Sequence, residues 1–149
     1  MAKLSITKLA LFGSMGMCVG LGMYTFVYAK GFSYLSSAPE ACVNCHVMRE
    51  QYDGWQKSSH HNVAVCADCH LPRNVVGKYF TKAENGFMHS LMFTLQTYPD
   101  HIQIRDVSRG IVNRNCVQCH GQLAEHIAPK DAEATDSRFC TRCHSNVGH

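Results

Sequence analysis

The feature that most constrains this chain is a short motif, Cys-x-x-Cys-His, which occurs four times in 149 residues. The copies begin at Cys42, Cys66, Cys116 and Cys140, and together they use eight of the nine cysteines. Two cysteines at this spacing, followed directly by histidine, form the attachment signature of c-type haem, in which the thiols make thioethers and the histidine reaches the iron. A single copy is equally compatible with half a zinc site or a redox pair. Four copies predict four covalently bound c-type haems.

The predicted attachment residues are Cys42, Cys45, Cys66, Cys69, Cys116, Cys119, Cys140 and Cys143. After the apolar N-terminal segment, about 120 residues of mostly polar sequence remain, too few for a large protein core. We therefore expect the haems to form the core of a mostly α-helical, loop-rich domain. Strand-period alternation is absent, which predicts little or no β-sheet. The net charge of +3 is too small to indicate a nucleic-acid partner.

The segment from Leu9 to Ala29 contains no charged side chain. As a helix it would be about 31 Å long, which matches a bilayer hydrocarbon core of about 30 Å. The alternative is a cleaved signal peptide, with Lys3 and Lys8 as its basic region and residues 36–38 as its cleavage site. The apolar run is longer than the usual apolar region of a signal peptide, so we expect one transmembrane helix.

The predicted organisation is a cytoplasmic tip and membrane anchor over residues 1–30, followed by a haem domain over residues 31–149. Lys3 and Lys8, with no acidic residue before the helix, favour an inside N-terminus. Covalent haem attachment takes place outside the cytoplasm. We therefore expect a single-pass protein of the bacterial inner membrane with its haem domain on the periplasmic side. Gly16 and Gly20 allow a homo-oligomer through the anchor, although glycine is common in such helices anyway.

The spacing of the motifs predicts two dihaem units. Their starts are 24 residues apart within residues 42–70 and again within residues 116–144, and 50 residues separate the middle two. The segment between them has helical periodicity over about residues 78–98, and Pro99 is expected to end that helix. Two interpretations remain open for its apolar side chains: contact with the membrane surface, or packing on haem edges.

Four low-spin haem irons require up to eight axial ligands, and the four motif histidines supply at most half of them. Among the other histidines, His60, His61 and His149 are candidates for distal ligands because they lie close to the motifs in the sequence. Met48 follows His46 by two residues and either packs beside the haem or replaces His46 on the iron. A thioether ligand would raise the reduction potential of that haem.

Several features occur together: the N-terminal anchor, four motifs at these spacings, Met48, the sequence Ser58-Ser59-His60, and the sequence Val147-Gly148-His149. With them the chain resembles the NapC/NirT/NrfH family of membrane tetrahaem quinol dehydrogenases, and most closely its NrfH branch. The resemblance implies that the protein oxidises menaquinol and passes electrons to a periplasmic reductase. The reductase implied most strongly is the pentahaem catalytic subunit of cytochrome c nitrite reductase.

The resemblance also implies a set of iron ligands. Met48 would bind the first iron in place of His46, and the proximal ligands of the other three irons would be His70, His120 and His144. The resemblance assigns His60 to the fourth haem and His149 to the third. It leaves the distal ligand of the second haem open, with His101, His126, water or a partner subunit as sources.

A quinol site is implied on the predicted helix 78–98. Lys82 matches a lysine near the quinol pocket, and His89 stands where some relatives carry aspartate beside the first haem. His89 would either cap the first iron or accept a proton. Quinol oxidation releases protons as well as electrons, so we expect Lys82 to position the quinol oxygen and His89 or Glu84 to accept a proton.

Two other functions are compatible with four haems. One is an electron-relay anchor without quinol chemistry. The other is a reductase that acts itself on nitrite or hydroxylamine, for which Arg105, Arg109 and Arg114 are the clustered basic residues. Menaquinol is preferred to ubiquinol because bis-histidine haems lack the increase in potential that methionine ligation brings.

Overall fold

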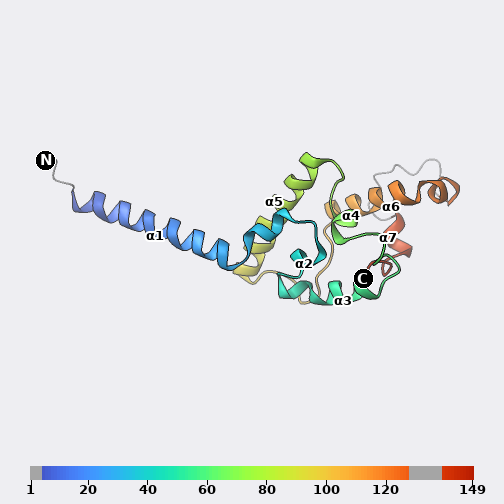
Figure 1. The fold of residues 1–149 in the computed structure, drawn as a ribbon, viewed down its shortest axis with the longest axis horizontal. Coiled ribbons are helices and arrows are strands. Elements are labelled where there is room, and N and C mark those ends of the chain that lie inside the picture. The colour runs from blue at the N-terminus through green and yellow to red at the C-terminus, as the bar shows by residue number, and fades with distance from the viewer. Residues whose placement is uncertain (1–4, 128–138) are drawn as a thin grey trace. The chain divides into compact units, whose positions relative to one another are not determined.

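The computed structural model describes residues 5–127 and 139–149, so Lys3 lies outside the described residues. The chain divides into one unit over Met1–Ser33 and another over Tyr34–His149. The prediction of a mostly helical protein is confirmed, and the described residues contain no strand (Figure 1). The elements are α1 (Ile6–Tyr28), η1 (Gly31–Leu35), α2 (Pro39–Cys42), η2 (His46–Met48), α3 (Arg49–Lys57), α4 (Cys66–His70), α5 (Val75–Leu95), α6 (Asp106–Ile127) and α7 (Phe139–Cys143).

Helix α1 is the predicted apolar helix. It has 23 residues with a mean hydropathy of 1.5 over its most apolar stretch, which is long and apolar enough to cross a membrane. The backbone leaves the helix at Lys30, whose φ of 53° is in the left-handed region. A side chain at the next residue, Gly31, would meet the ring of Phe26, which would have to turn aside to make room. The first unit therefore ends a few residues after α1, at Ser33.

Helix α5 is the predicted insert helix, with different ends. It begins at Val75 rather than residue 78, because the Asn74 side chain accepts a hydrogen bond from the Gly77 amide and caps the first turn. It ends at Leu95 rather than residue 98, because Gln96 adopts a left-handed conformation with φ 53°. The helix therefore ends before the chain reaches Pro99.

The four motifs lie on elements that contact one another in sequence order. Helix α2 contacts α4, α4 packs on α6, and α6 packs on α7. Asn115 holds the second and third motifs together, because its Nδ2 donates to the carbonyls of Cys69 and Leu71, both at 2.9 Å. Asn113 on the same helix accepts a hydrogen bond from the Thr141 amide at 3.2 Å. The motifs thus form one continuous series, although the insert separates the middle two along the chain.

Few protein side chains are buried. The buried positions among the described residues are Pro39, Thr81, Gly110, Ile111, Asn113 and Asn115. Ile111, 5% exposed, is the large apolar side chain of this set. Most of the others are small or polar, which agrees with the expectation that protein side chains alone do not make the core of this domain.

Candidate functional site

In three of the four motifs the local structure places the two cysteines and the histidine on one side. In α4 and α6, and in α7 with the residue that follows it, the two cysteines and the histidine stand at i, i+3 and i+4, which share a helix face. The first motif differs, since Cys42 ends α2 whereas His46 opens η2. In α6 the helix bends at His120, where φ is −105° and ψ is 25°. This arrangement suits two thioethers and one axial histidine on each haem.

His70, the histidine of the second motif, lies beside His149. Their ring centres are 5.9 Å apart and their planes differ by 19°. With metal–nitrogen bonds of about 2 Å, two imidazoles on opposite sides of one metal have ring centres about 6 Å apart. Burial, and then the neighbouring His149, lowers the pKa of His70 to about 4, so its ring is neutral at neutral pH. A neutral ring is the form that binds a metal.

His60 makes a second pair with His120 of the third motif. The ring centres are 6.1 Å apart and the planes are 77° from parallel. The Nδ1 of His60 lies 3.0 Å from the carbonyl oxygen of Val147 and can donate to it. That bond leaves Nε2 of His60 as the nitrogen available to a metal, which is the usual arrangement for a metal-binding histidine.

The ligand assignment that the resemblance implied stays a prediction, and these two ring contacts suggest another pairing. His149 lies beside the histidine of the second motif rather than the third, and His60 lies beside the histidine of the third motif rather than the fourth. The reason is tertiary: His60 follows α3 and bonds to Val147, which brings residues 147–149 to α3 and α4. His61 instead packs edge-on against Trp55, with ring centres 4.6 Å apart.

Gly54 in α3 makes room for His149. A Cβ on Gly54 would lie 3.0 Å from the Cα of His149 and 3.1 Å from its carbonyl carbon. These are backbone atoms, which cannot rotate away as the end of a flexible side chain can. A side chain at position 54 would therefore require the His149 backbone to shift from its observed place beside His70. The sequence carried no signal for this, because an isolated glycine in a helix does not by itself indicate which segment packs against it.

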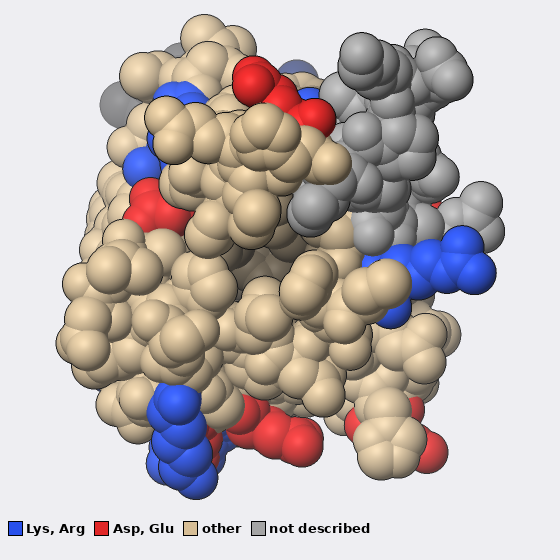
Figure 2. All heavy atoms as spheres, turned by 90° about the vertical axis from the view of Figure 1, so that its right-hand side faces the viewer, with Lys and Arg blue, Asp and Glu red and all other residues tan. Residues whose placement is uncertain are grey.

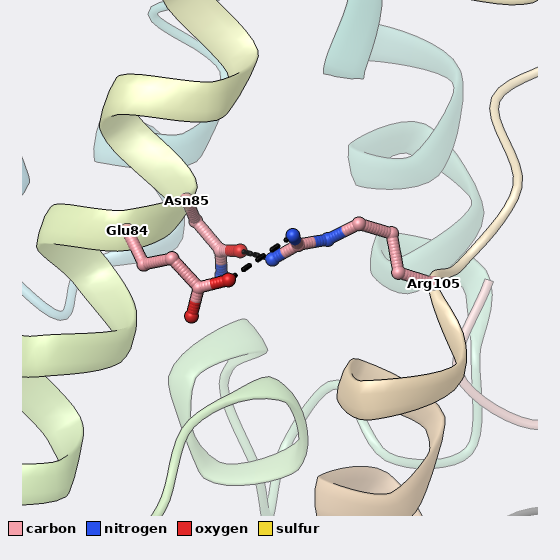
Figure 3. A network of polar contacts seen from close by, with 3 residues as sticks. All are labelled: Glu84, Asn85 and Arg105. Atoms are coloured by element: carbon pink, nitrogen blue, oxygen red, sulfur yellow. Dashed lines mark hydrogen bonds and ion pairs between the residues drawn. The ribbon is translucent and has the colours of Figure 1, made fainter.

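Two of the three quinol-site candidates already have partners. The Nζ of Lys82 donates to the Ser36 carbonyl, and Lys82 is close enough to the first motif for its charge to interact with the Cys42 thiol. Glu84 forms an ion pair with Arg105 at 3.2 Å. Figure 3 shows the Arg105 guanidinium reaching from the start of α6 to both Glu84 and Asn85 on α5. The sequence pattern indicates Arg105 only as a candidate anion-binding residue.

Electrostatics keep the third candidate, His89, neutral. Desolvation, and then the positive charge of Arg105, lowers the pKa of His89 below its usual value. Desolvation and the charge of Lys78 likewise lower the pKa of Lys82. A neutral imidazole near pH 7 is able to accept a proton. The same helix therefore carries a hydrogen-bond donor close to the first motif and a neutral base.

The face of the molecule in Figure 2 is hollowed at its centre. Uncharged residues surround the hollow, and the Lys, Arg, Asp and Glu side chains visible in this view lie towards the margins.

Two of the three clustered arginines have acidic partners, Arg105 with Glu84 and Arg109 with Asp106. These pairs do not favour Arg105 and Arg109 as donors to a bound anion.

Comparison with known proteins gives one family and several relatives. Residues 3–149 match the model of the NapC/NirT cytochrome c family, N-terminal region. The chain is 41% identical to the cytochrome c-type protein NrfH of Wolinella succinogenes, over 89% of this chain and 80% of that one. It is 33% identical to the cytochrome c nitrite reductase subunit NrfH of Nitratidesulfovibrio vulgaris, over 95% and 83%.

A solved structure also resembles this fold. It is a chain in the crystal structure of the cytochrome c nitrite reductase NrfHA complex bound to the HQNO inhibitor. The TM-score is 0.65 and the identity 31%, and the match covers 94% of this chain and 89% of that chain. The likeness therefore extends over both the apolar helix and the four motifs.

Proposed function

Because this chain belongs to the NapC/NirT cytochrome c family, we propose that it is a membrane-anchored tetrahaem cytochrome c that oxidises menaquinol and passes the electrons to the catalytic subunit of cytochrome c nitrite reductase. The observation that carries the proposal is the order of contacts between the motif elements, α2 to α4 to α6 to α7, with Lys82 close to the first motif. When bound, each haem accepts and releases one electron. An uninterrupted series of motifs that begins beside a quinol site suits transfer from quinol to a partner.

The residues present fit four c-type haems. Eight cysteines would provide the thioethers, and the ring centres of two histidine pairs have a separation compatible with one metal between them. In this proposal His70 and His149 would hold the second iron, and His120 and His60 would hold the third. Met48 would bind the first iron and His144 the fourth.

In the proposed quinol site, Lys82 donates a hydrogen bond to a quinol oxygen and His89 accepts a proton. Quinol oxidation releases two protons with its two electrons, so a neutral base beside the first motif is needed. His89 meets this need because its pKa is lowered. Glu84, which pairs with Arg105, fixes the arginine and thereby the electrostatic environment of His89. Lys82 and His89 are seven residues apart on α5 and therefore lie on one side of it.

We propose that the unit Tyr34–His149 lies on the periplasmic side of the bacterial inner membrane. The support is α1, which is long and apolar enough to span, together with Lys8 near its start and the covalent attachment of haem. Basic residues at the N-terminal end of a membrane helix favour the cytoplasmic side for that end.

The experiment that tests the quinol site measures menaquinol oxidation by the purified complex with nitrite as acceptor. We expect Lys82→Ala and His89→Ala each to lower turnover about 100-fold or more, the range for loss of a general base or its positioning partner. Lys57→Ala, at the end of α3, is the matched control and should keep normal turnover. Nitrite reduction driven by an artificial reductant should be normal in every variant. Unchanged quinol turnover in both Lys82→Ala and His89→Ala would remove α5 from the mechanism.

The same preparation distinguishes the other two functions. If menaquinol reduced none of the four haems, the chain would be an electron-relay anchor without quinol chemistry. If the purified chain alone reduced nitrite or hydroxylamine rapidly with an artificial donor, it would be a reductase itself. We expect neither outcome.

A further inference from the structure

Helix α5 has an apolar face without a protein partner among the described residues. Val76 is 82% exposed, Phe80 71%, Phe87 67% and Leu91 39%. These residues follow one another at intervals of four, seven and four, so they line one side of the helix. The other residues on this line are the uncharged Ala83, Ser90 and Thr94. We call the line from Val76 to Leu91 the α5 stripe.

The opposite side of α5 is the side that packs against the rest of its unit. Thr81 there is 8% exposed, and Asn85 accepts a hydrogen bond from Arg105. Lys82, which donates to the Ser36 carbonyl and lies close to the first haem motif, is also on the opposite side. The first motif therefore lies on that side of α5, opposite the α5 stripe.

A short segment of the chain connects the end of α1 to Tyr34, which packs on the middle of α5. A Cβ on Gly86 would lie 3.1 Å from a ring carbon of Tyr34, so this tyrosine packs directly on α5. Tyr34 follows Tyr28, the last residue of α1, by six residues. Six residues reach at most about 20 Å even when fully extended. The segment that connects the end of α1 to the tyrosine packed on α5 is therefore short.

We propose that the α5 stripe docks on the lipid surface beside the anchor, with Phe80, Phe87 and Leu91 at the boundary between headgroups and acyl chains. A large exposed apolar face marks an interaction site, and an uncharged face with aromatic residues suits a lipid interface. Because α5 and the anchor belong to one chain and a short segment connects them, docking beside the anchor is an intramolecular event. The proposal rests on the membrane anchor and not on quinol oxidation.

The test uses the full-length protein with its four haems in vesicles of phosphatidylethanolamine and phosphatidylglycerol. A fraction of the lipid carries a photoreactive diazirine in its acyl chain, and mass spectrometry locates the adducts after illumination. We expect adducts on α1 and on the α5 stripe. Phe87→Glu should lower labelling of the remaining stripe residues at least fivefold. The matched control Val107→Glu changes a residue 68% exposed in the first turn of α6 and should leave labelling of α5 unchanged.

Two outcomes would overturn the proposal. One is lipid adducts confined to α1. The other is α5 adducts that join two protein chains rather than protein and lipid, which would assign the stripe to a second copy. If Phe87→Glu does not accumulate as a four-haem protein by its absorption spectrum, Leu91→Gln replaces it. The labelling pattern of the unaltered protein decides between the outcomes in either case.

Discussion

The imidazole rings of His70 and His149 lie nearly parallel with their centres 5.9 Å apart, although the two residues are far apart in the sequence. His60 and His120 make the other close histidine pair, but with nearly perpendicular rings. The relative orientation of two axial imidazoles changes the electronic splitting at a low-spin ferric iron. We therefore expect the two centres to give different signals in electron paramagnetic resonance.

The pairing itself is testable by comparing single and double variants. His70→Met and His149→Met should each raise the reduction potential of one haem, since thioether ligation favours the reduced iron. The double variant should alter the same single haem, because both residues serve one iron. The haem reduction potentials should be measured only on protein in which mass spectrometry finds four attached haems. Two altered haems in the double variant would show that the residues serve different irons.

Gly54→Ala should displace His149. A Cβ at this position comes within 3.0 Å of the His149 backbone. We expect one of the four haems to gain high-spin character in the absorption spectrum, because its distal ligand has moved. Glycine to alanine within a helix normally stabilises by roughly 0.5–1 kcal/mol, so a loss of ligation would be a steric effect. Gly13→Ala in α1, where nothing lies within 4 Å of the new Cβ, is the control. Unchanged low-spin spectra for Gly54→Ala would contradict the role given to Gly54.

Arg105→Gln should shift the pH profile of menaquinol oxidation to higher pH. The positive charge of Arg105 contributes, after desolvation, to the lowered pKa of His89, so its removal raises that pKa. A base acts in its neutral form, so activity is present above this pKa and is lost as the pH falls through it. Raising the pKa therefore moves the acid limb upwards. Arg109→Gln removes only the ion pair with Asp106 at the surface and should leave the limb in place. An unmoved limb in Arg105→Gln would mean that the limb does not report His89.

Asn115→Ala should destabilise the haem-motif unit. Asn115 is 5% exposed and donates to two backbone carbonyls at the second motif, which would lose their donors. A buried group that loses its hydrogen-bond partner costs about 1–3 kcal/mol. Thermal unfolding followed by circular dichroism in the haem bands measures the change. Asn62→Ala, at an exposed position, is the control and should have little effect. Equal midpoints for the two variants would count against Asn115 as the link between α4 and α6.

The helices and the motifs could be predicted from the sequence, because both depend on local periodicity and on a fixed spacing of cysteine and histidine. The predicted ends of α5 were less accurate. Pro99 is a clear stop signal in the sequence, but the helix ends earlier, at the left-handed Gln96, and it begins earlier because Asn74 caps it. Periodicity reports the residues within one helix. It does not report where a neighbouring segment meets that helix.

The two histidine pairs and the Arg105 network could not be predicted from the sequence for this reason. The place of His149 depends on a missing Cβ at Gly54 and on the bond between His60 and Val147, both of which join distant segments. Arg105 was visible as a basic residue, but its partners, Glu84 and Asn85, are twenty or more residues away on another helix. Such relationships come from tertiary packing, and neither composition nor spacing encodes them.

The small number of buried side chains has a consequence for how the protein is made. With Ile111 as the large apolar residue buried in the described part, the polypeptide alone has little to hold the unit Tyr34–His149 folded. We therefore expect haem attachment and folding to occur together. Each haem that becomes covalently attached would also fill part of the interior of the unit. We expect a chain that lacks one attachment motif to be removed by proteases rather than to accumulate as a three-haem protein. Protein quality control would therefore allow only chains that carry all four haems to reach the partner subunit.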